Sequence, residues 1–212
     1  MATSEQKRQK KLKKRKQKQN LVKKLSSSLS KTNPVTLFSK YPIHDCLVPD
    51  NLHETGLGTI VISRRSPGGE IGCSAFVVDI YCLGVKDVMF TINDENEYED
   101  FLKPRLLRGN EGNIENVHPA CVRKLVEGAV SYARDLGFAP HSDYRKYKAI
   151  FGDIEKSVCP EKYSFGKDGK PFYINGPNKT SKQSERIIKQ LENVCGEGNF
   201  NFMLGSGDFL EE

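Results

Sequence analysis

One stretch of the sequence restricts the fold more than any other. Residues 70–83, EIGCSAFVVDIYCL, are almost continuously apolar. Successive side chains of an extended strand point to opposite sides, so this segment would present apolar groups on both faces. One face holds Phe76, Val78 and Ile80, and the other holds Ile71, Cys73, Ala75 and Val77. A half-exposed strand would alternate apolar with polar residues. We therefore expect a central strand that is covered on both sides.

Further strand patterns lie before and after this segment. Residues 58–65 (GTIVISRR) predict a preceding strand, and residues 86–92 predict a following one. A hairpin is expected at residues 163–174, because the Asp-Gly pair in its middle favours a tight turn. Alternating aromatic residues favour a last strand at residues 200–204.

Three helices are expected from apolar spacing and end signals. The first begins at Pro119 and ends before Gly137. The second spans residues 142–152. The third begins at a cap at Thr180 or Ser181 and ends at Gly196. A short helix is possible at residues 98–102, and residues 34–57 read as an irregular entry segment. Strands cluster before helices, which predicts an α+β fold with a mixed or antiparallel sheet and about three helices.

Charge divides the chain into two unequal parts. Of the 33 basic and 27 acidic residues, 11 basic residues and one acid lie in residues 1–25, which gives +10. The other 22 basic and 26 acidic residues give −4. We expect residues 1–33 to be a disordered basic arm, because a block of like charges buries too little apolar surface to become ordered. We expect residues 34–207 to form a single compact domain, and residues 208–212 a loose acidic tail.

The basic arm is the strongest functional signal. Its densest block consists of Lys7, Arg8, Lys10, Lys11, Lys13, Lys14, Arg15, Lys16 and Lys18. Lys and Arg bind phosphates and release counterions from nucleic acid, which makes such binding depend on salt. No aromatic residue lies within the block, so base stacking is not expected. The arm therefore predicts contact with nucleic acid, most plausibly RNA or a ribonucleoprotein, or else a localisation signal.

Composition also bears on the compartment. The start of the chain is charged, and no apolar run is long enough to cross a membrane, so we expect a cytoplasmic protein, or a nuclear one in a eukaryote, without a membrane partner. The six cysteines are far apart and none forms a C-x-x-C pair. We expect most of them to be small core residues, in a reducing compartment and with no bound metal.

An acid interrupts the apolar run of residues 70–83. Asp79 lies in the sequence VVDIY, where a buried carboxylate is costly unless it is paired, hydrogen-bonded or bound to a metal. The structural interpretation pairs it with Arg64, Arg65 or Lys86.

The catalytic interpretation of Asp79 groups it with Glu70 and Asp87. Carboxylates on neighbouring strands resemble the layout of ribonuclease-H-like nucleases over residues 58–92, and that resemblance implies Mg²⁺ or Mn²⁺ as cofactor. The first strand of that family carries an acid, whereas residues 58–65 carry none. Without this nuclease alternative, we expect no cofactor.

Two weaker catalytic candidates remain. Cys82 is followed four residues later by Lys86, and a nearby positive charge is what a nucleophilic thiol requires. His53 and Glu54 are adjacent and form a conceivable acid/base pair. The Gly56-x-Gly58 pair precedes a strand instead of a helix, which excludes a dinucleotide-binding loop.

These observations favour an accessory or adaptor protein, tethered to nucleic acid by its arm, whose acidic body binds a protein partner. The alternatives are a metal-dependent nuclease, and a plain interaction domain whose arm is a localisation signal. On balance, the sequence does not favour an enzyme.

Overall fold

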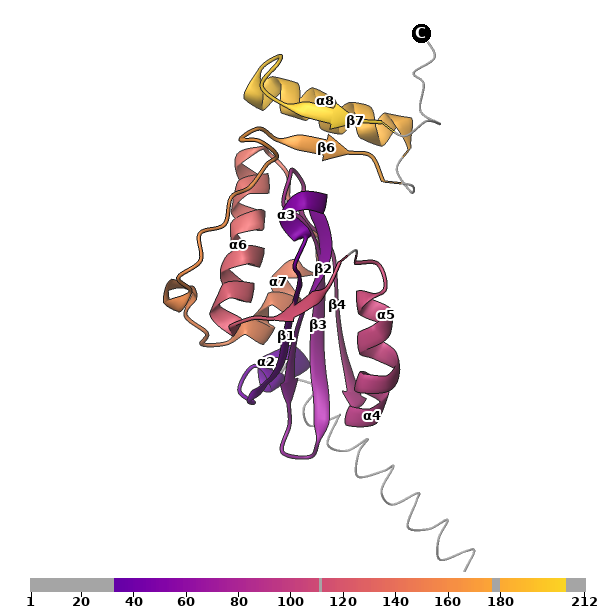
Figure 1. Cartoon of the computed structure of the whole chain (residues 1–212), viewed down its shortest axis with the longest axis vertical. Helices are drawn as coiled ribbons and strands as arrows, with labels where there is room; N and C mark the ends of the chain where they lie inside the picture. Colours follow the sequence, from indigo (N-terminus) through magenta and orange to yellow (C-terminus); the bar gives the residue numbers. More distant parts are fainter. Residues whose placement is uncertain (1–32, 111, 177–179, 205–212) are drawn as a thin grey trace, which may run out of the picture.

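The computed structural model describes residues 33–110, 112–176 and 180–204 (Figure 1). The expected basic arm, apart from residue 33, and the expected acidic tail lie outside these residues.

A five-stranded antiparallel sheet forms the centre of the protein. Its strands are β1 (Ile43–Pro49), β2 (Leu57–Arg65), β3 (Glu70–Asp79), β4 (Gly84–Asp94) and β5 (Ile114–Asn116). The spatial order is β4-β3-β2-β1-β5, so the first four strands follow one another across the sheet. The expected α+β fold is confirmed, and so are the strands expected near residues 58–65, 70–83 and 86–92, which correspond to β2, β3 and β4.

Helices cover both faces of this sheet (Figure 1). On one face lie α6 (Pro119–Asp135) and α7 (Tyr144–Tyr147), with the 3-10 turn η2 (Lys148–Phe151). On the other face lie α4 (Glu95–Glu97), the π-helical turn η1 (Tyr98–Leu102) and α5 (Lys103–Leu107).

The apolar run of β3 contributes to both cores. The α6 side includes Phe76 and Val78, and the η1 side includes Ile71, Cys73 and Ala75. All five side chains are at most 4% exposed. The expectation of a central strand that is buried on both faces is therefore confirmed.

Helix α6 begins and ends where its sequence predicts. The Nδ1 atom of His118 accepts a hydrogen bond from the backbone N–H of Ala120 at 3.2 Å, and Pro119 occupies the first helical position. Gly137 lies just beyond the helix with φ of 85°, a left-handed conformation in which a side chain would be strained.

A smaller layer stands at one end of the sheet (Figure 1). It consists of α8 (Ser181–Cys195) with β6 (Phe172–Ile174) and β7 (Asn201–Met203), which pair in parallel. The expected last helix, with its cap at Thr180, and the last strand are confirmed.

The predicted 163–174 hairpin is wrong. Its turn exists, with Asp168 at φ of 52° and a single bridge between Lys167 and Lys170, but no strand precedes it. The ring of Phe165 instead stacks on Tyr132 of α6, with ring centroids 5.8 Å apart. Gly128 of the same helix leaves room for that ring, because a Cβ there would lie 2.5 Å from it. The strand that does form, β6, therefore pairs with the distant β7.

The entry segment and the end of β3 also differ from the sequence prediction. The entry segment is ordered, with α2 (Pro34–Phe38), β1 and α3 (Leu52–Thr55), because β1 is completed by pairing with β2 and β5. Strand β3 ends at Asp79 instead of residue 83, since the following four residues form a turn. The short helix expected at residues 98–102 is part of the longer run from α4 to α5.

Arg64 joins three segments from inside the protein. The residue is 5% exposed. Its guanidinium donates hydrogen bonds to the carbonyls of Tyr41, Ile150 and Phe151 at 2.6, 2.8 and 3.0 Å. Burial lowers the pKa of Arg64, while Asp153 opposes that effect. The side chain therefore connects β2 to the segment before β1 and to η2.

Arg64→Met should destabilise the fold strongly, because it leaves three carbonyls without their donor. We expect a loss of roughly 3 kcal/mol or more in the free energy of unfolding, measured by urea denaturation. Arg65→Met is the matched control: Arg65 is half-exposed and pairs with Glu95 on the surface, so its loss should be about 1 kcal/mol or less. Equal losses in the two variants would contradict this role for Arg64.

Candidate functional site

Asp79 stabilises the turn that follows β3. Its Oδ1 atom accepts hydrogen bonds from the backbone N–H groups of Tyr81 at 3.0 Å and Cys82 at 2.9 Å. The residue is 6% exposed. The carboxylate is therefore compensated by backbone donors, which the sequence pattern did not reveal.

The expected ion pair of Asp79 with Arg64 or Arg65 is wrong. Those arginines lie opposite Gly72 and Ile71, toward the other end of β3. Lys86 attracts the Asp79 carboxylate, but no salt bridge joins the two within the described part of the chain. Burial raises the pKa of Asp79 to about 6, against the opposing effects of Lys86 and the backbone N–H groups.

The carboxylates of the nuclease interpretation do not gather at one place. Glu70 and Asp79 occupy opposite ends of β3, about 30 Å apart at 3.3 Å per residue. Asp87 lies opposite Val77, with its side chain 70% exposed and its Oδ1 atom 3.8 Å from His141 Nε2. A two-metal nuclease needs convergent carboxylates, and Glu70 and Asp79 cannot bridge the same ion.

One other group of side chains has the composition of a metal site. Among the described residues, His44, Asp45 and Glu99 bring their ligand atoms within 4.8 Å of one another. The ammonium of Lys103 already binds Asp45 at 2.9 Å and Glu99 at 3.1 Å, and Tyr98 donates a further hydrogen bond to Asp45. The lysine therefore takes the position between the carboxylates that a cation would need.

Cys82 lacks the setting of a nucleophile. It is fully buried, in a cluster with Leu136, Tyr173 and Leu191. Burial and the nearby Asp79 raise the pKa of its thiol, and the attraction of Lys86 does not offset them. A reactive cysteine needs its thiolate form, so this environment favours a structural residue.

His53 lines a cleft of about 410 Å³ between β1, α3 and the start of α6. Its ring stacks on Tyr163, with centroids 6.1 Å apart and planes 12° apart. His118, Glu115 and Glu161 also line the cleft. Glu54 does not line it; the backbone carbonyls of His53 and Glu54 lie 2.7 and 2.8 Å from the Tyr81 hydroxyl.

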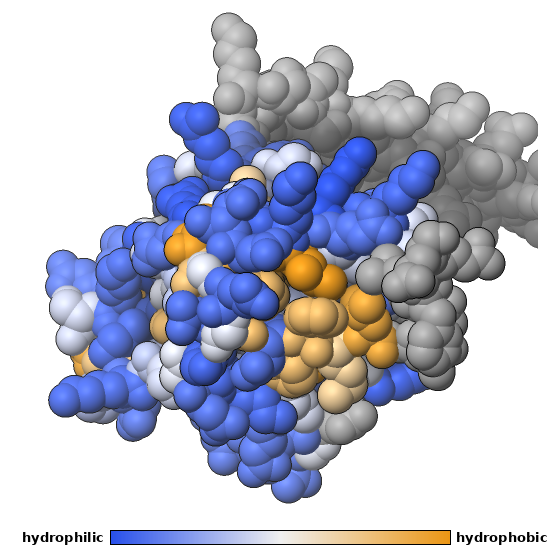
Figure 2. Space-filling view, turned by 90° about the horizontal axis from the view of Figure 1, so that it is seen from above, coloured by the Kyte–Doolittle hydropathy of each residue, from blue (hydrophilic) through white to orange (hydrophobic). Residues whose placement is uncertain are grey.

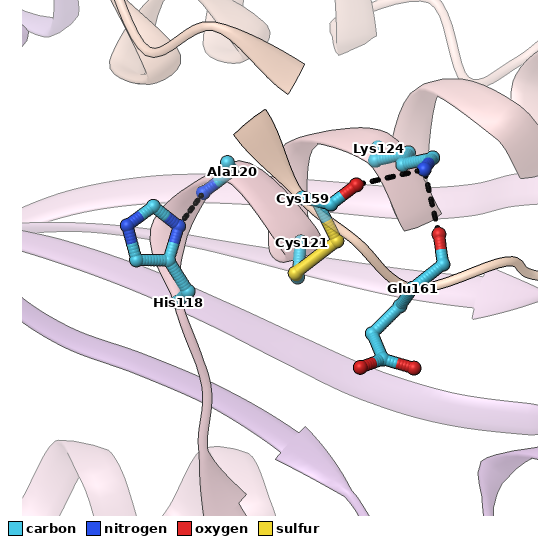
Figure 3. The surroundings of a disulfide bond; sticks show 6 residues. All are labelled: His118, Ala120, Cys121, Lys124, Cys159 and Glu161. Atoms are coloured by element: carbon cyan, nitrogen blue, oxygen red, sulfur yellow. Dashed lines mark hydrogen bonds between the residues drawn. A yellow bond between two sulfur atoms is a disulfide. The ribbon is translucent and has the colours of Figure 1, made fainter. Parts of the chain in front are cut away.

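A disulfide closes one side of this cleft. Cys121 of α6 is bonded to Cys159, and Lys124 Nζ donates to the carbonyls of Cys159 at 3.0 Å and Glu161 at 2.6 Å (Figure 3). The sequence, from which we expect a reducing compartment, does not predict this bond between the two cysteines. They lie 38 residues apart, so only the fold brings them together.

The residues that line this cleft suit a binding site better than an acid/base catalytic centre. Val48, Leu52, Val117 and Leu125 give it apolar walls, and imidazole, carboxylate and phenol groups surround them. No hydrogen bond or salt bridge joins its histidines to a carboxylate within the described residues. The oriented pair that general acid/base catalysis uses is not assembled at His53.

Asp79→Asn should change how stability depends on pH. The folded protein holds the Asp79 proton more tightly than the unfolded chain does, so the stabilisation is full below pH 3.8 and is lost as pH rises through about 6. The change from 3.8 to about 6 corresponds to about 3 kcal/mol. Urea unfolding at about pH 4 and about pH 7 should show wild type losing roughly 2 kcal/mol relative to the asparagine variant, because the more acidic condition already lies slightly above the unfolded value of 3.8. A difference that stays constant with pH would contradict the buried, turn-capping carboxylate.

Within the described residues, no helix is both long and apolar enough to cross a membrane. Comparisons of the chain with protein families, with curated proteins and with solved structures found no match.

Proposed function

We propose that this protein is an accessory or adaptor protein, which binds nucleic acid, in the form of RNA or a ribonucleoprotein, through its basic arm. Its acidic body binds a protein partner. The supporting structural observation is the apolar, open-edged surface of the smaller layer.

That surface lies at the end of the molecule where β6, β7 and α8 are found. Viewed from this end, hydrophobic side chains gather in one patch among hydrophilic ones (Figure 2). The exposed apolar residues of these elements are Ile174, Val194, Phe202 and Met203. Phe202 and Met203 are 49% and 57% exposed. Neighbouring exposed apolar side chains are typical of protein contact surfaces.

Strand β7 has an edge that no other strand covers among the described residues, because its sheet contains only β6 and β7. The other side of β6 is partly occupied, since the N–H of Phe172 donates to the carbonyl of Tyr81 at 3.1 Å. An open edge offers unpaired backbone donors and acceptors to an added strand. The partner we propose is a protein segment that extends this sheet as a strand and places apolar side chains on Phe202 and Met203.

The charge distribution supports separate roles for the two parts. The arm carries +10 and the remainder −4, so attraction to phosphates is concentrated in residues 1–25. We also propose a cytoplasmic location, or a nuclear one in a eukaryote. In a reducing compartment, cellular thiols would act against the Cys121–Cys159 bond, whose two cysteines are buried.

RNA binding should depend steeply on salt and little on RNA sequence. Neutralising Lys10, Lys11, Lys13 and Lys14 to Gln should lower the slope of log K against log[salt] by about 3, at about 0.7 for each single-strand phosphate contact. Fluorescence anisotropy with two unrelated RNA oligomers at several salt concentrations measures both quantities.

The control for this experiment removes the same charge from the body. Lys40, Lys146, Lys182 and Lys189 are exposed, and their replacement by Gln should leave the slope almost unchanged. If the body variant loses as much slope as the arm variant, the arm is not the principal contact.

A further inference from the structure

A second cleft lies between the end of α6 and the start of α7. It has a volume of about 420 Å³, and its walls come from the last turn of α6, the connecting loop and α7 with η2. The residues that line it are Arg134, Pro140, His141, Ser142, Tyr144, Arg145 and Lys148. We call it the α6–α7 cleft.

The cleft is built on fixed parts of the structure. Tyr144, 3% exposed, packs edge-on against Phe76 of the sheet. The loop is held to the sheet by the N–H of His141, which donates to the Val85 carbonyl at 2.9 Å. Lys148 Nζ lies 5.7 Å from the ring centroid of Tyr144, which places its charge over that ring.

The charges of this cleft are not balanced by the protein. Arg134, Arg145 and Lys148 take part in none of the salt bridges among the described residues. Other cations of the same body are paired, such as Arg123 with Glu127 and Lys103 with two acids.

No acid lines the cleft either. The closest acids along the chain are Asp135 and Asp143, both exposed. Asp143 donates its backbone N–H to His141 Nδ1 at 3.3 Å. Asp87 lies 3.8 Å from His141 Nε2, and it lines the neighbouring cleft that contains Lys86.

Three like charges around one concavity repel each other, and an anion in their midst would relieve that repulsion. Two guanidinium groups and an ammonium provide charged donors, and the Ser142 hydroxyl adds a neutral one. Guanidinium groups match the oxygen geometry of phosphate. We propose that the α6–α7 cleft binds a phosphate group. This phosphate group can belong to a nucleic-acid backbone or to a small phosphorylated compound. Only binding of a nucleic-acid backbone rests on the proposed function.

The test is a titration of the full-length protein with inorganic phosphate, followed by amide NMR shifts at constant ionic strength. We expect saturable shifts at residues 141–148. In the double variant Arg145→Gln, Lys148→Gln, the apparent Kd should rise at least about tenfold, which is about 1.4 kcal/mol. Lys146→Gln is the matched control, because Lys146 lies between the two on the same segment but does not line the cleft. Its Kd should stay within about twofold of wild type.

Absence of saturable shifts at residues 141–148, or equal weakening in the Lys146 control, would overturn the proposal. A second series adds an RNA oligomer to the phosphate-saturated protein. Displacement of phosphate from the cleft identifies backbone phosphate as the natural ligand, and retention identifies a small phosphorylated compound. Both results uphold the site. Because the arm is unchanged in every variant, failure of this site leaves the arm's RNA binding intact, and the reverse also holds.

Discussion

The burial of β3 on both faces is the constraint on which the rest of the structure depends. A strand with apolar side chains on both sides requires two covering layers, and neither layer is adjacent to it in sequence. Helix α6 supplies one, and the segment from α4 to α5 supplies the other. Gly72 shows how close the packing is, because a Cβ there would lie 2.2 Å from the Phe38 ring. Arg64, on the neighbouring strand, then holds the outer segments to the sheet through three carbonyls.

The end of β3 positions the smaller layer. The Asp79 carboxylate stabilises the turn by accepting hydrogen bonds from two backbone N–H groups, and the turn contains Ile80 and Tyr81. The Ile80 carbonyl accepts a hydrogen bond from the N–H of Gly166 at 3.0 Å. The Tyr81 carbonyl accepts one from the N–H of Phe172, the first residue of β6, at 3.1 Å. A buried acid that raises the possibility of catalysis in the sequence therefore has a structural task, which is to join the two layers.

Local patterns predict the elements whose signals are local. The two apolar faces of β3, the capped helix from Pro119 and the capped helix from Ser181 can all be read from residue spacing. Pairings between distant segments cannot be read in this way. Strand β6 pairs with β7 instead of forming a hairpin, and Cys121 is bonded to Cys159, which lies 38 residues away. The α6–α7 cleft combines residues from a helix end, a loop and a second helix, so its basic character appears only when the chain is folded. The arm's charge, by contrast, is visible in the sequence alone.

The central claim is that the arm and the body bind different partners. It is tested most directly by affinity capture of the full-length protein from its own cells, with and without nuclease, beside a Phe202→Asp, Met203→Asp variant. The account predicts that nuclease releases one set of captured components, while a second set resists nuclease and is lost in the double variant. A captured set that is unaffected by nuclease, and unchanged by the double variant, would contradict it.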